Sequence, residues 1–306
     1  MAQATRDAYG HLLETELYKN PDIVVLDADL GSSTRSMAFQ KVAPQRYFDM
    51  GISEQDMMGT AAGFAACGKI PLASTFAVFG TGRAFEQVRN SICLPNLNVK
   101  ICATHAGISV GEDGATHQSV EDMAIMRSLP NMSVVCPADA AETEAVVRAA
   151  VAHKGPVYVR MGRAPVEDVY RDGCPFQWGK GTILRDGSDV AIIATGLMVQ
   201  QAIIAADQLA GQGKEAMVID MASIKPLDED LVVAAAQKTH FIVTAEEHSI
   251  IGGLGGAVAE TLSRRCPTRQ AYVGLKDCFG ESGKAAELLE KYGLTAKGIV
   301  DACLLS

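Results

Sequence analysis

The chain has 306 residues, of which 48% are hydrophobic and 21% are charged, as is usual for a globular protein with a sizeable core. Its net charge of −9 argues against nucleic acid or an anionic membrane as the main partner, although a few local arginines could still bind a small phosphate. The eight cysteines lack C-x-x-C or metal-ligand spacing, which favours reduced thiols, a cytoplasmic protein and no metal site in this chain.

Short apolar runs alternate with helical patterns along the first half of the chain. Strands are expected at residues 23–26, 71–75, 99–104, 133–136 and 157–160, and helices at residues 5–17, 53–67, 82–94, 119–127 and 140–152. The expected strands are continuously apolar rather than alternating, which is typical of strands buried on both faces of a parallel sheet. Helices between them would then cover both faces of that sheet.

The stretch 162–188 interrupts this rhythm with two prolines, several glycines and the only tryptophan, and it predicts a domain boundary. The alternation then resumes, with strands expected at 190–194, 217–219, 241–244 and 271–273 and helices at 198–209, 228–237 and 256–262. The predicted fold class is α/β, with two parallel-sheet domains that carry helices on both faces. We expect a first domain at residues 1–165, a linker at 166–188 and a second domain at 189–306.

An acidic residue, Glu54, stands at the start of the helix expected at 53–67, after the flexible Gly51. Ser53 and Asp56 have the spacing of a capping box. Locally, Glu54 could simply be an acid favoured by the positive end of the helix dipole. Its place after a buried strand also fits a carboxylate that points at a ligand beyond the carboxyl edge of the sheet.

A polar loop follows the strand expected at 99–104. Residues 104–118 hold two of the six histidines, His105 and His117, together with Asp113, a second acid and three glycines. Such loops at strand ends carry the chemistry of many α/β enzymes, so a functional role is favoured over a turn of purely geometric purpose. The spacing of these histidines and Asp113 matches no standard metal site.

Two other features are ambiguous when taken alone. Phe76 and Phe79 lie three residues apart after a strand, and such pairs more often fill a core than form a cofactor platform. Arg6 lies near the start of the first expected helix, where a solvated arginine is usual.

Taken together, these segments resemble the C-terminal half of transketolase over nearly the whole chain. The run from Gly111 to Gln118 is similar to the G-E-D-G-x-T-H-Q motif of that family, and residues 127–131 and 137–139 continue the match. Residues 51–54 resemble its pyrimidine-binding segment. The resemblance implies a transferase that uses thiamine diphosphate to move a two-carbon ketol unit between sugar phosphates, by default those of the pentose phosphate pathway.

The resemblance also implies a role for each matching cofactor contact. Glu54 would hydrogen-bond the aminopyrimidine and so activate the cofactor. Asp29 would lie near the thiazolium ring, and Leu30 would press the cofactor into its bent shape. Phe79 would stack on the pyrimidine, with Phe76 beside it.

The substrate contacts follow from the same resemblance. His105 and Asp113 would take part in catalysis by hydrogen-bonding the sugar hydroxyls. The residues expected to hold the substrate phosphate are Arg6, Ser33, His117 and Arg160. Arginine suits this task because its planar fork donates two hydrogen bonds to an oxyanion, and Arg163 competes with Arg160 for the role.

The chain lacks a segment that the family needs. None of its Asp-Gly stretches is followed by the asparagine that completes the G-D-G…N diphosphate site of the family. The resemblance therefore implies a separate N-terminal-half subunit that binds the diphosphate and its Mg²⁺ or Ca²⁺ and shares the cofactor with this chain. An α2β2 heterotetramer is the expected assembly.

Several alternatives stay open at this stage. The 1-deoxyxylulose-5-phosphate synthases share the Gly-Ile-x-Glu-Gln wording, but they usually have arginine where this chain has His105. The β subunits of 2-oxoacid dehydrogenases share Gly-Ile-x-Glu but lack the run that begins at Gly111. The third alternative is a regulatory subunit that retains the fold without catalysis, although such a subunit would have no physical need for Glu54. The sequence also leaves the donor and acceptor sugars open.

Overall fold

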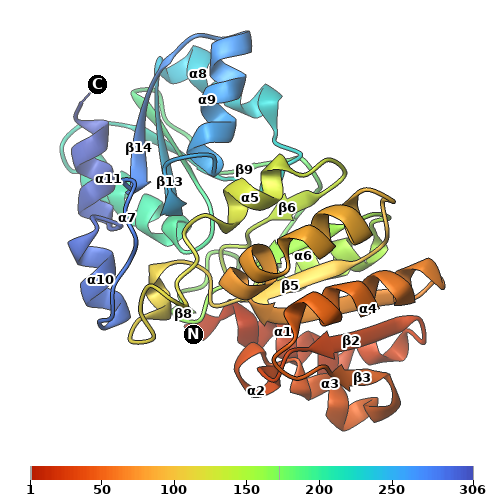
Figure 1. The fold of residues 1–306 in the computed structure, drawn as a ribbon. Coiled ribbons are helices and arrows are strands. Elements are labelled where there is room, and N and C mark those ends of the chain that lie inside the picture. Colours follow the sequence, from red (N-terminus) through yellow and green to blue (C-terminus); the bar gives the residue numbers. More distant parts are fainter. Residues whose placement is uncertain (1, 172, 306) are drawn as a thin grey trace.

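The computed structural model describes residues 2–171 and 173–305, which form two sheets covered by helices (Figure 1). The first sheet has the strand order β12 (Ser223–Lys225), β6 (Ser133–Val135), β7 (Val157–Arg160), β5 (Lys100–Thr104), β4 (Ile70–Phe76), β2 (Ile23–Asp27) and β3 (Tyr47–Asp49). The second has the order β14 (Arg269–Leu275), β13 (Phe241–Ser249), β10 (Val190–Ala194), β11 (Ala216–Asp220) and β9 (Thr182–Arg185). Neighbouring strands pair in parallel, apart from the edge strands β12 and β9.

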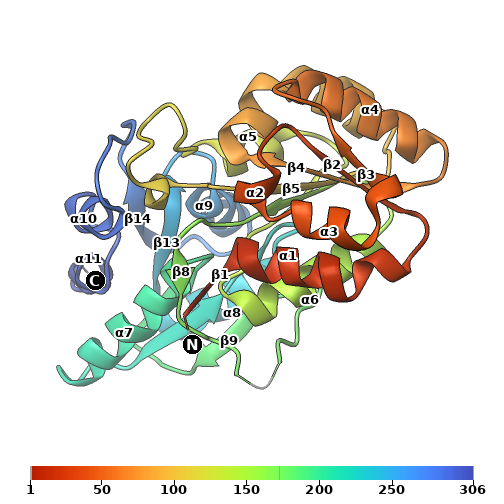
Figure 2. The ribbon, with the colours of Figure 1, turned by 90° about the horizontal axis from the view of Figure 1, so that it is seen from below.

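Helices cover both faces of these sheets, so the predicted α/β class is confirmed. Around the first sheet lie α1 (Thr5–Thr15), α2 (Gly31–Thr34), α3 (Met37–Val42), α4 (Glu54–Ala66), α5 (Asp122–Ser128) and α6 (Ala140–Ala152). Figure 2 shows α4 on one side of this sheet and α1, α3 and α6 on the other. Around the second lie α7 (Met198–Ala210), α8 (Glu229–Thr239), α9 (Leu254–Arg265), α10 (Ala285–Lys291) and α11 (Ala296–Cys303). None of the helices described is both long and apolar enough to cross a membrane.

Single turns complete the chain and include one departure from expectation. The 3₁₀ turns are η1 (Leu17–Lys19), η2 (Pro44–Arg46) and η5 (Ile108–Val110). The helix expected at 82–94 is instead a pair of π-helical segments, η3 (Phe79–Arg83) and η4 (Gln87–Cys93). Glycine and threonine at positions 80–82 disfavour a regular α-helix there, and π-turns are often found at functional sites.

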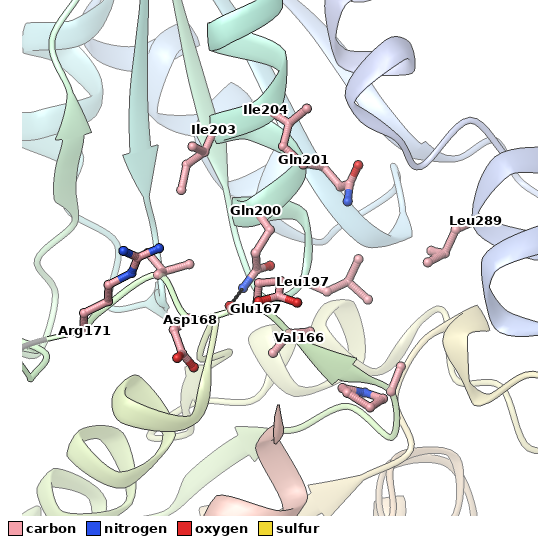
Figure 3. Close-up of a pocket in the computed structure, with 13 residues that line it drawn as sticks. Val166, Glu167, Asp168, Arg171, Leu197, Gln200, Gln201, Ile203, Ile204 and Leu289 are labelled. Atoms are coloured by element: carbon pink, nitrogen blue, oxygen red, sulfur yellow. Dashed lines mark hydrogen bonds between the residues drawn. The ribbon is translucent and has the colours of Figure 1, made fainter. Parts of the chain in front are cut away.

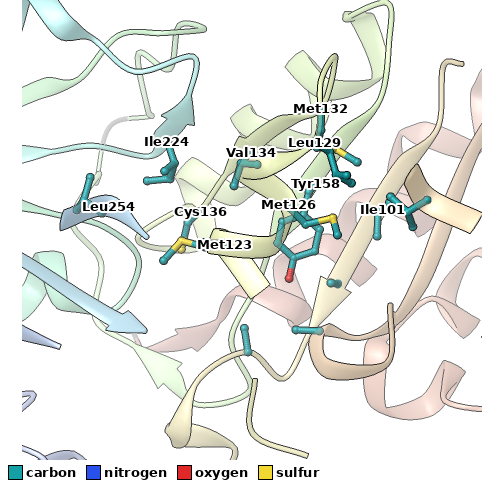
Figure 4. Packing of buried hydrophobic residues seen from close by; sticks show 14 of the residues in the cluster. Ile101, Met123, Met126, Leu129, Met132, Val134, Cys136, Tyr158, Ile224 and Leu254 are labelled. Carbon is teal, nitrogen blue, oxygen red and sulfur yellow. The ribbon is translucent and has the colours of Figure 1, made fainter. Parts of the chain in front are cut away.

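The two halves of the chain are joined more closely than a flexible linker would allow. Strand β12 comes after the stretch 166–188 but pairs with β6 of the first sheet. The short strand β8 (Pro165–Val166) pairs with β1 (Gln3–Ala4) at the N-terminus. One apolar core runs through both halves, and in Figure 4 Met123 and Met126 of the first half lie in the same cluster as Ile224 and Leu254 of the second.

A buried charge network also crosses this junction. Arg160, at the end of β7, donates from Nε to Asp122 Oδ2 at 2.7 Å and from Nη2 to the backbone oxygen of Glu247 in β13 at 2.9 Å. Tyr158 donates to the same Asp122 oxygen at 2.7 Å. Burial alone would raise the pKa of Asp122, but the charge of Arg160 and these hydrogen bonds hold it below its usual value.

We predict that Arg160→Met lowers the free energy of unfolding by about 3–5 kcal/mol, because it leaves the fully buried Asp122 carboxylate without its cation. Arg148→Met is the matched control: Arg148 is exposed, and its ion pairs with Glu16 and Glu144 should contribute less than about 1 kcal/mol. Urea unfolding at pH 7 measures both. Equal, small losses would show that the Arg160 network does not hold the two halves together.

Candidate active site

Two acids at strand ends shape the loop that carries Asp29 and Leu30. Asp27, buried at the end of β2, accepts a hydrogen bond from the Leu30 N–H at 2.6 Å. Asp49, at the end of β3, accepts from the N–H groups of Asp29 and Gly51, at 3.1 and 3.0 Å. This shared acceptor places the Asp29 loop beside the segment that leads into α4.

Glu54 is the first residue of α4, and only 1% of it is exposed. Both carboxylate oxygens accept from Nη1 of Arg83 at 2.9 Å. The capping box predicted for this helix is wrong, because the Ser53 side chain makes no capping hydrogen bond. The Glu54 carboxylate is therefore held by an ion pair rather than engaged in capping the helix.

Phe79 and Arg83 are the first and last residues of η3. This single turn places the Arg83 side chain over the Phe79 ring. The Arg83 Cζ atom lies 4.3 Å from the centroid of the Phe79 ring. Arg83 thus contacts both Glu54 and Phe79. Sequence reasoning overlooked it; the available signal was an arginine one turn after an aromatic pair, although the π-turn that orients it could not be seen.

The two phenylalanines and two histidines named from the sequence form one cluster. Phe76 stacks on the His105 ring, with centroids 3.7 Å apart, and also lies parallel to Phe79 at 5.9 Å. His117 meets the Phe79 ring edge-on at 5.4 Å. The end of β4 and the loop after β5 therefore meet at the same sheet edge, as parallel pairing of these strands requires.

His105 is buried against a group of cations. Arg6 Nη1 lies 3.2 Å from His105 Nε2, and since arginine can only donate, Nε2 accepts. The His105 Nδ1–H then donates to Thr104 Oγ1 at 2.8 Å. Burial first, and then the charges of Arg6 and Arg163, lower the pKa of His105 to about 3. The ring is therefore neutral at physiological pH.

The same corner of the site favours an anion. Arg6 Nη1 also donates to the backbone oxygen of Ser33 at 2.9 Å, while its Nε is buried without a partner among the described residues. Burial and the nearby charges of Arg35 and Arg163 lower the pKa of Arg6. A group of cations with a donor to spare is suited to a phosphate or carboxylate.

Arg160 does not join this group. Its guanidinium is buried and bonded to Asp122 and to backbone oxygens. The cavity that it lines measures about 20 Å³, room for roughly one water molecule. The expectation that Arg160 holds a substrate phosphate therefore does not fit its surroundings. The charge of Arg163 does act on Arg6 and His105, and its Nη1 lies 3.4 Å from Glu112 Oε2.

The second half of the chain holds the loop that carries these histidines. Gln118 Nε2 donates to the backbone oxygen of Ile108 at 3.2 Å and to that of Glu281 at 2.9 Å. Glu247 accepts from the Ser109 N–H at 2.6 Å. Burial raises the pKa of Glu247 to about 7. Sequence reasoning did not assign these contacts, because partners more than a hundred residues apart leave no local pattern.

Asp113, in contrast, lies exposed on this loop, and its carboxylate has no hydrogen-bond partner among the described residues. The glycine-rich turn at residues 252–256 leads into α9. Glu246 accepts from the N–H groups of Leu254 and Gly255, at 2.7 and 2.8 Å, and so caps α9.

A sizeable cavity lies elsewhere. It has a volume of about 770 Å³ and lies between residues 164–171 and α7, where Leu197, Gln200 and Ile204 line it (Figure 3). None of the candidate site residues lines it. The candidate site residues lie apart from this cavity, at the edge of the first sheet where β4 and β5 end.

Comparison with known families matches this geometry. Residues 1–167 match the family described as "Transketolase, pyrimidine binding domain", and residues 179–299 match "Transketolase, C-terminal domain". This chain belongs to the transketolase family. Membership with these two domains implies dependence on thiamine diphosphate.

Individual relatives of the transketolase family support the assignment. A solved structure titled "Split gene transketolase, inactive beta4 tetramer" shares 53% identity and a TM-score of 0.92, over 100% of this chain and 98% of that one. A Methanocaldococcus jannaschii protein, provisionally named as a transketolase C-terminal section, is 49% identical over 96% of this chain and 93% of its own. The 6-deoxy-6-sulfo-D-fructose transketolase subunit of Clostridium sp. (strain MSTE9) is 45% identical, and the match covers 97% of this chain and 92% of that protein.

More distant relatives are longer. The 1-deoxy-D-xylulose-5-phosphate synthase of Desulfotalea psychrophila is 36% identical, and this chain matches 45% of it. The whole chain thus corresponds to about half of such an enzyme.

The transketolase residues present fit one part of the cofactor. Glu54 is a buried acceptor, and the face of Phe79 lies beside it, with the flat guanidinium of Arg83 between them. The space between the Glu54 carboxylate and the Phe79 ring, here called the pyrimidine slot, holds one planar group, the guanidinium of Arg83. A space of this kind suits an aminopyrimidine ring. The described residues hold no cluster of three or more histidine, cysteine or acidic side chains that could bind the metal of a diphosphate.

We predict that Arg6→Met raises the pKa of His105 above its value of about 3, because it removes the cation that contacts Nε2. Burial, the larger cause, remains, so the pKa should stay below the ordinary value of about 6.5. Titration of the His105 ring by NMR measures the shift. Arg35→Met, which removes a weaker influence, is the control, and an equal shift in both variants would contradict a direct role of the Arg6 contact.

Proposed function

We propose that this chain is the pyrimidine-binding subunit of a split transketolase, which transfers a two-carbon ketol unit between sugar phosphates together with a separate diphosphate-binding subunit. The observation that carries the proposal is the buried Glu54 carboxylate beside the Phe79 ring. A carboxylate is costly to bury unless it has a task or a partner. Here it faces the slot that fits an aminopyrimidine.

The cofactor, when bound, supplies a carbon nucleophile at its thiazolium ring. The task of this chain would be to bind and orient the cofactor. Glu54 would hydrogen-bond N1′ of the aminopyrimidine and accept from its N–H once N1′ is protonated, as in the imino form, while Phe79 and Phe76 would provide an aromatic wall. Asp29 and Leu30, on the loop held by two strand-end acids, are the proposed contacts to the rest of the cofactor.

The substrate site lies next to this slot. His105 is neutral because of burial and nearby cations, and its Nε2, which accepts from Arg6 in this structure, is the proposed acceptor for a sugar hydroxyl. Asp113 is exposed and available for a second hydroxyl. Arg6, with Ser33 and His117 beside it, is proposed to hold the phosphate, and Arg163 takes the place first given to Arg160.

We propose that a partner subunit completes the site. This chain supplies acceptors and aromatic rings for the pyrimidine but no metal cluster among its described residues, so the partner is proposed to bind the diphosphate and Mg²⁺ or Ca²⁺. The α2β2 arrangement is part of this proposal. The related structure whose title calls it an inactive β4 tetramer supports the view that the chain alone is not catalytic.

We predict that Glu54→Gln lowers the turnover of the two-subunit enzyme by about a hundredfold or more, because an amide cannot take over the proton-accepting role of the carboxylate. The assay is ketol transfer from xylulose 5-phosphate with saturating thiamine diphosphate and Mg²⁺. Asp56→Asn is the matched control, since Asp56 is an exposed acid in the same turn of α4. Near-normal turnover of Glu54→Gln would remove Glu54 from this role.

We predict that Arg163→Met raises the KM for xylulose 5-phosphate by about tenfold or more, the loss expected for a charge-assisted hydrogen bond, and leaves the KM for unphosphorylated xylulose unchanged. Arg89→Met is the control, because Arg89 is exposed and paired with Glu86. Equal changes for the two sugars would show that Arg163 does not contact the phosphate.

A further inference from the structure

Arg83 lies in the slot that the proposed function gives to the cofactor. Its Nη1 donates to both oxygens of Glu54 at 2.9 Å, and its Cζ lies 4.3 Å from the centre of the Phe79 ring. Within the described part of the chain, no other side chain hydrogen-bonds the Glu54 carboxylate. The guanidinium is a flat cationic donor that meets one acceptor and one aromatic face.

Those two contacts are the ones that an aminopyrimidine ring would need. A ring that bonds Glu54 and stacks on Phe79 would overlap the guanidinium, so both groups cannot occupy the slot together. Resting on the proposed function, we propose that Arg83 is a displaceable occupant of the pyrimidine slot. In the free subunit it neutralises the buried Glu54 charge, and it moves out when the cofactor enters.

The surroundings of Arg83 allow this movement. Its side chain is 47% exposed, whereas Glu54 is almost fully buried. Gly82, just before it, has open space where a side chain would begin. A long side chain at the surface of a π-turn can therefore swing into solvent without disturbing the core. The ion pair is partly screened on the Arg83 side, and the entering pyrimidine would replace the guanidinium as the hydrogen-bond partner of the buried Glu54.

The occupant should weaken cofactor binding in proportion to the time that it fills the slot. Apparent affinity falls by the fraction of molecules in the competent state. If the slot is open about one-tenth of the time, removal of the guanidinium should tighten binding about tenfold. The same ion pair keeps Glu54 from standing as an unpaired buried charge before assembly.

The deciding experiment measures the Kd of thiamine diphosphate, at saturating Mg²⁺, for the reconstituted two-subunit complex carrying wild-type chain, Arg83→Met or Arg89→Met. We expect Arg83→Met to bind about tenfold more tightly and Arg89→Met to match wild type. Unchanged or weaker binding by Arg83→Met would overturn the proposal and identify Arg83 as neutral or as a cofactor ligand. If the wild-type complex binds no cofactor, the proposed function fails, and the displacement fails with it.

The free subunit gives a second readout that needs neither cofactor nor partner. Arg83→Met should lower its Tm, because Glu54 loses the one cation that pairs with it among the described residues, and adding Glu54→Gln should recover most of that loss. Additive or independent effects of the two substitutions would overturn the ion pair as a stabilising contact. Binding that tightens together with this recovery is the pattern that a displaceable occupant predicts.

Discussion

The placement of the site depends on a buried arginine that touches no ligand. Arg160 ends a central strand and cannot leave its position without exposing the Asp122 carboxylate to an apolar core. Its third partner is the backbone of β13, so the ion pair fixes the second sheet against the first. The neighbouring Glu247 side chain then holds Ser109 in the histidine loop. The loop geometry is thus set by a domain that contributes no proposed ligand contact.

Charge is divided across the site in a way that matches its two proposed tasks. At one end, Arg6 contacts a neutral His105 and keeps a buried Nε without a partner among the described residues, while the nearby Arg163 is paired with Glu112. At the other, Glu54 is a single buried anion balanced by Arg83. The aromatic rings of Phe76 and Phe79 separate these ends. A substrate phosphate could therefore bind at the cationic end while the pyrimidine of the cofactor binds at Glu54, so the two would not compete for the same side chain.

Much of the fold could be predicted from the sequence, because buried parallel strands are continuous apolar runs and each is followed by a helical pattern. The short edge strands β3, β9 and β12 were not predicted, since three or four residues give no periodicity. The family resemblance implied that Phe76, Phe79, His105 and His117 share one site, and their cluster lies where the parallel strands β4 and β5 end. Arg83 and Glu247 could not be found in this way, because a π-turn and a contact across 138 residues have no local signature. Arg160 was given a ligand role by the family resemblance, and neither its burial nor its Asp122 partner can be read from the residues around it.

We propose that this chain completes a thiamine diphosphate site only with a second subunit. The most direct test is equilibrium binding of thiamine diphosphate with Mg²⁺ to the purified chain, first alone and then with a separate diphosphate-binding subunit. The account predicts weak or no binding by the chain alone, and tight binding with ketol transfer from xylulose 5-phosphate in the mixture. Absence of binding in the mixture, with both proteins folded, would contradict it, and so would full affinity and turnover by the chain alone.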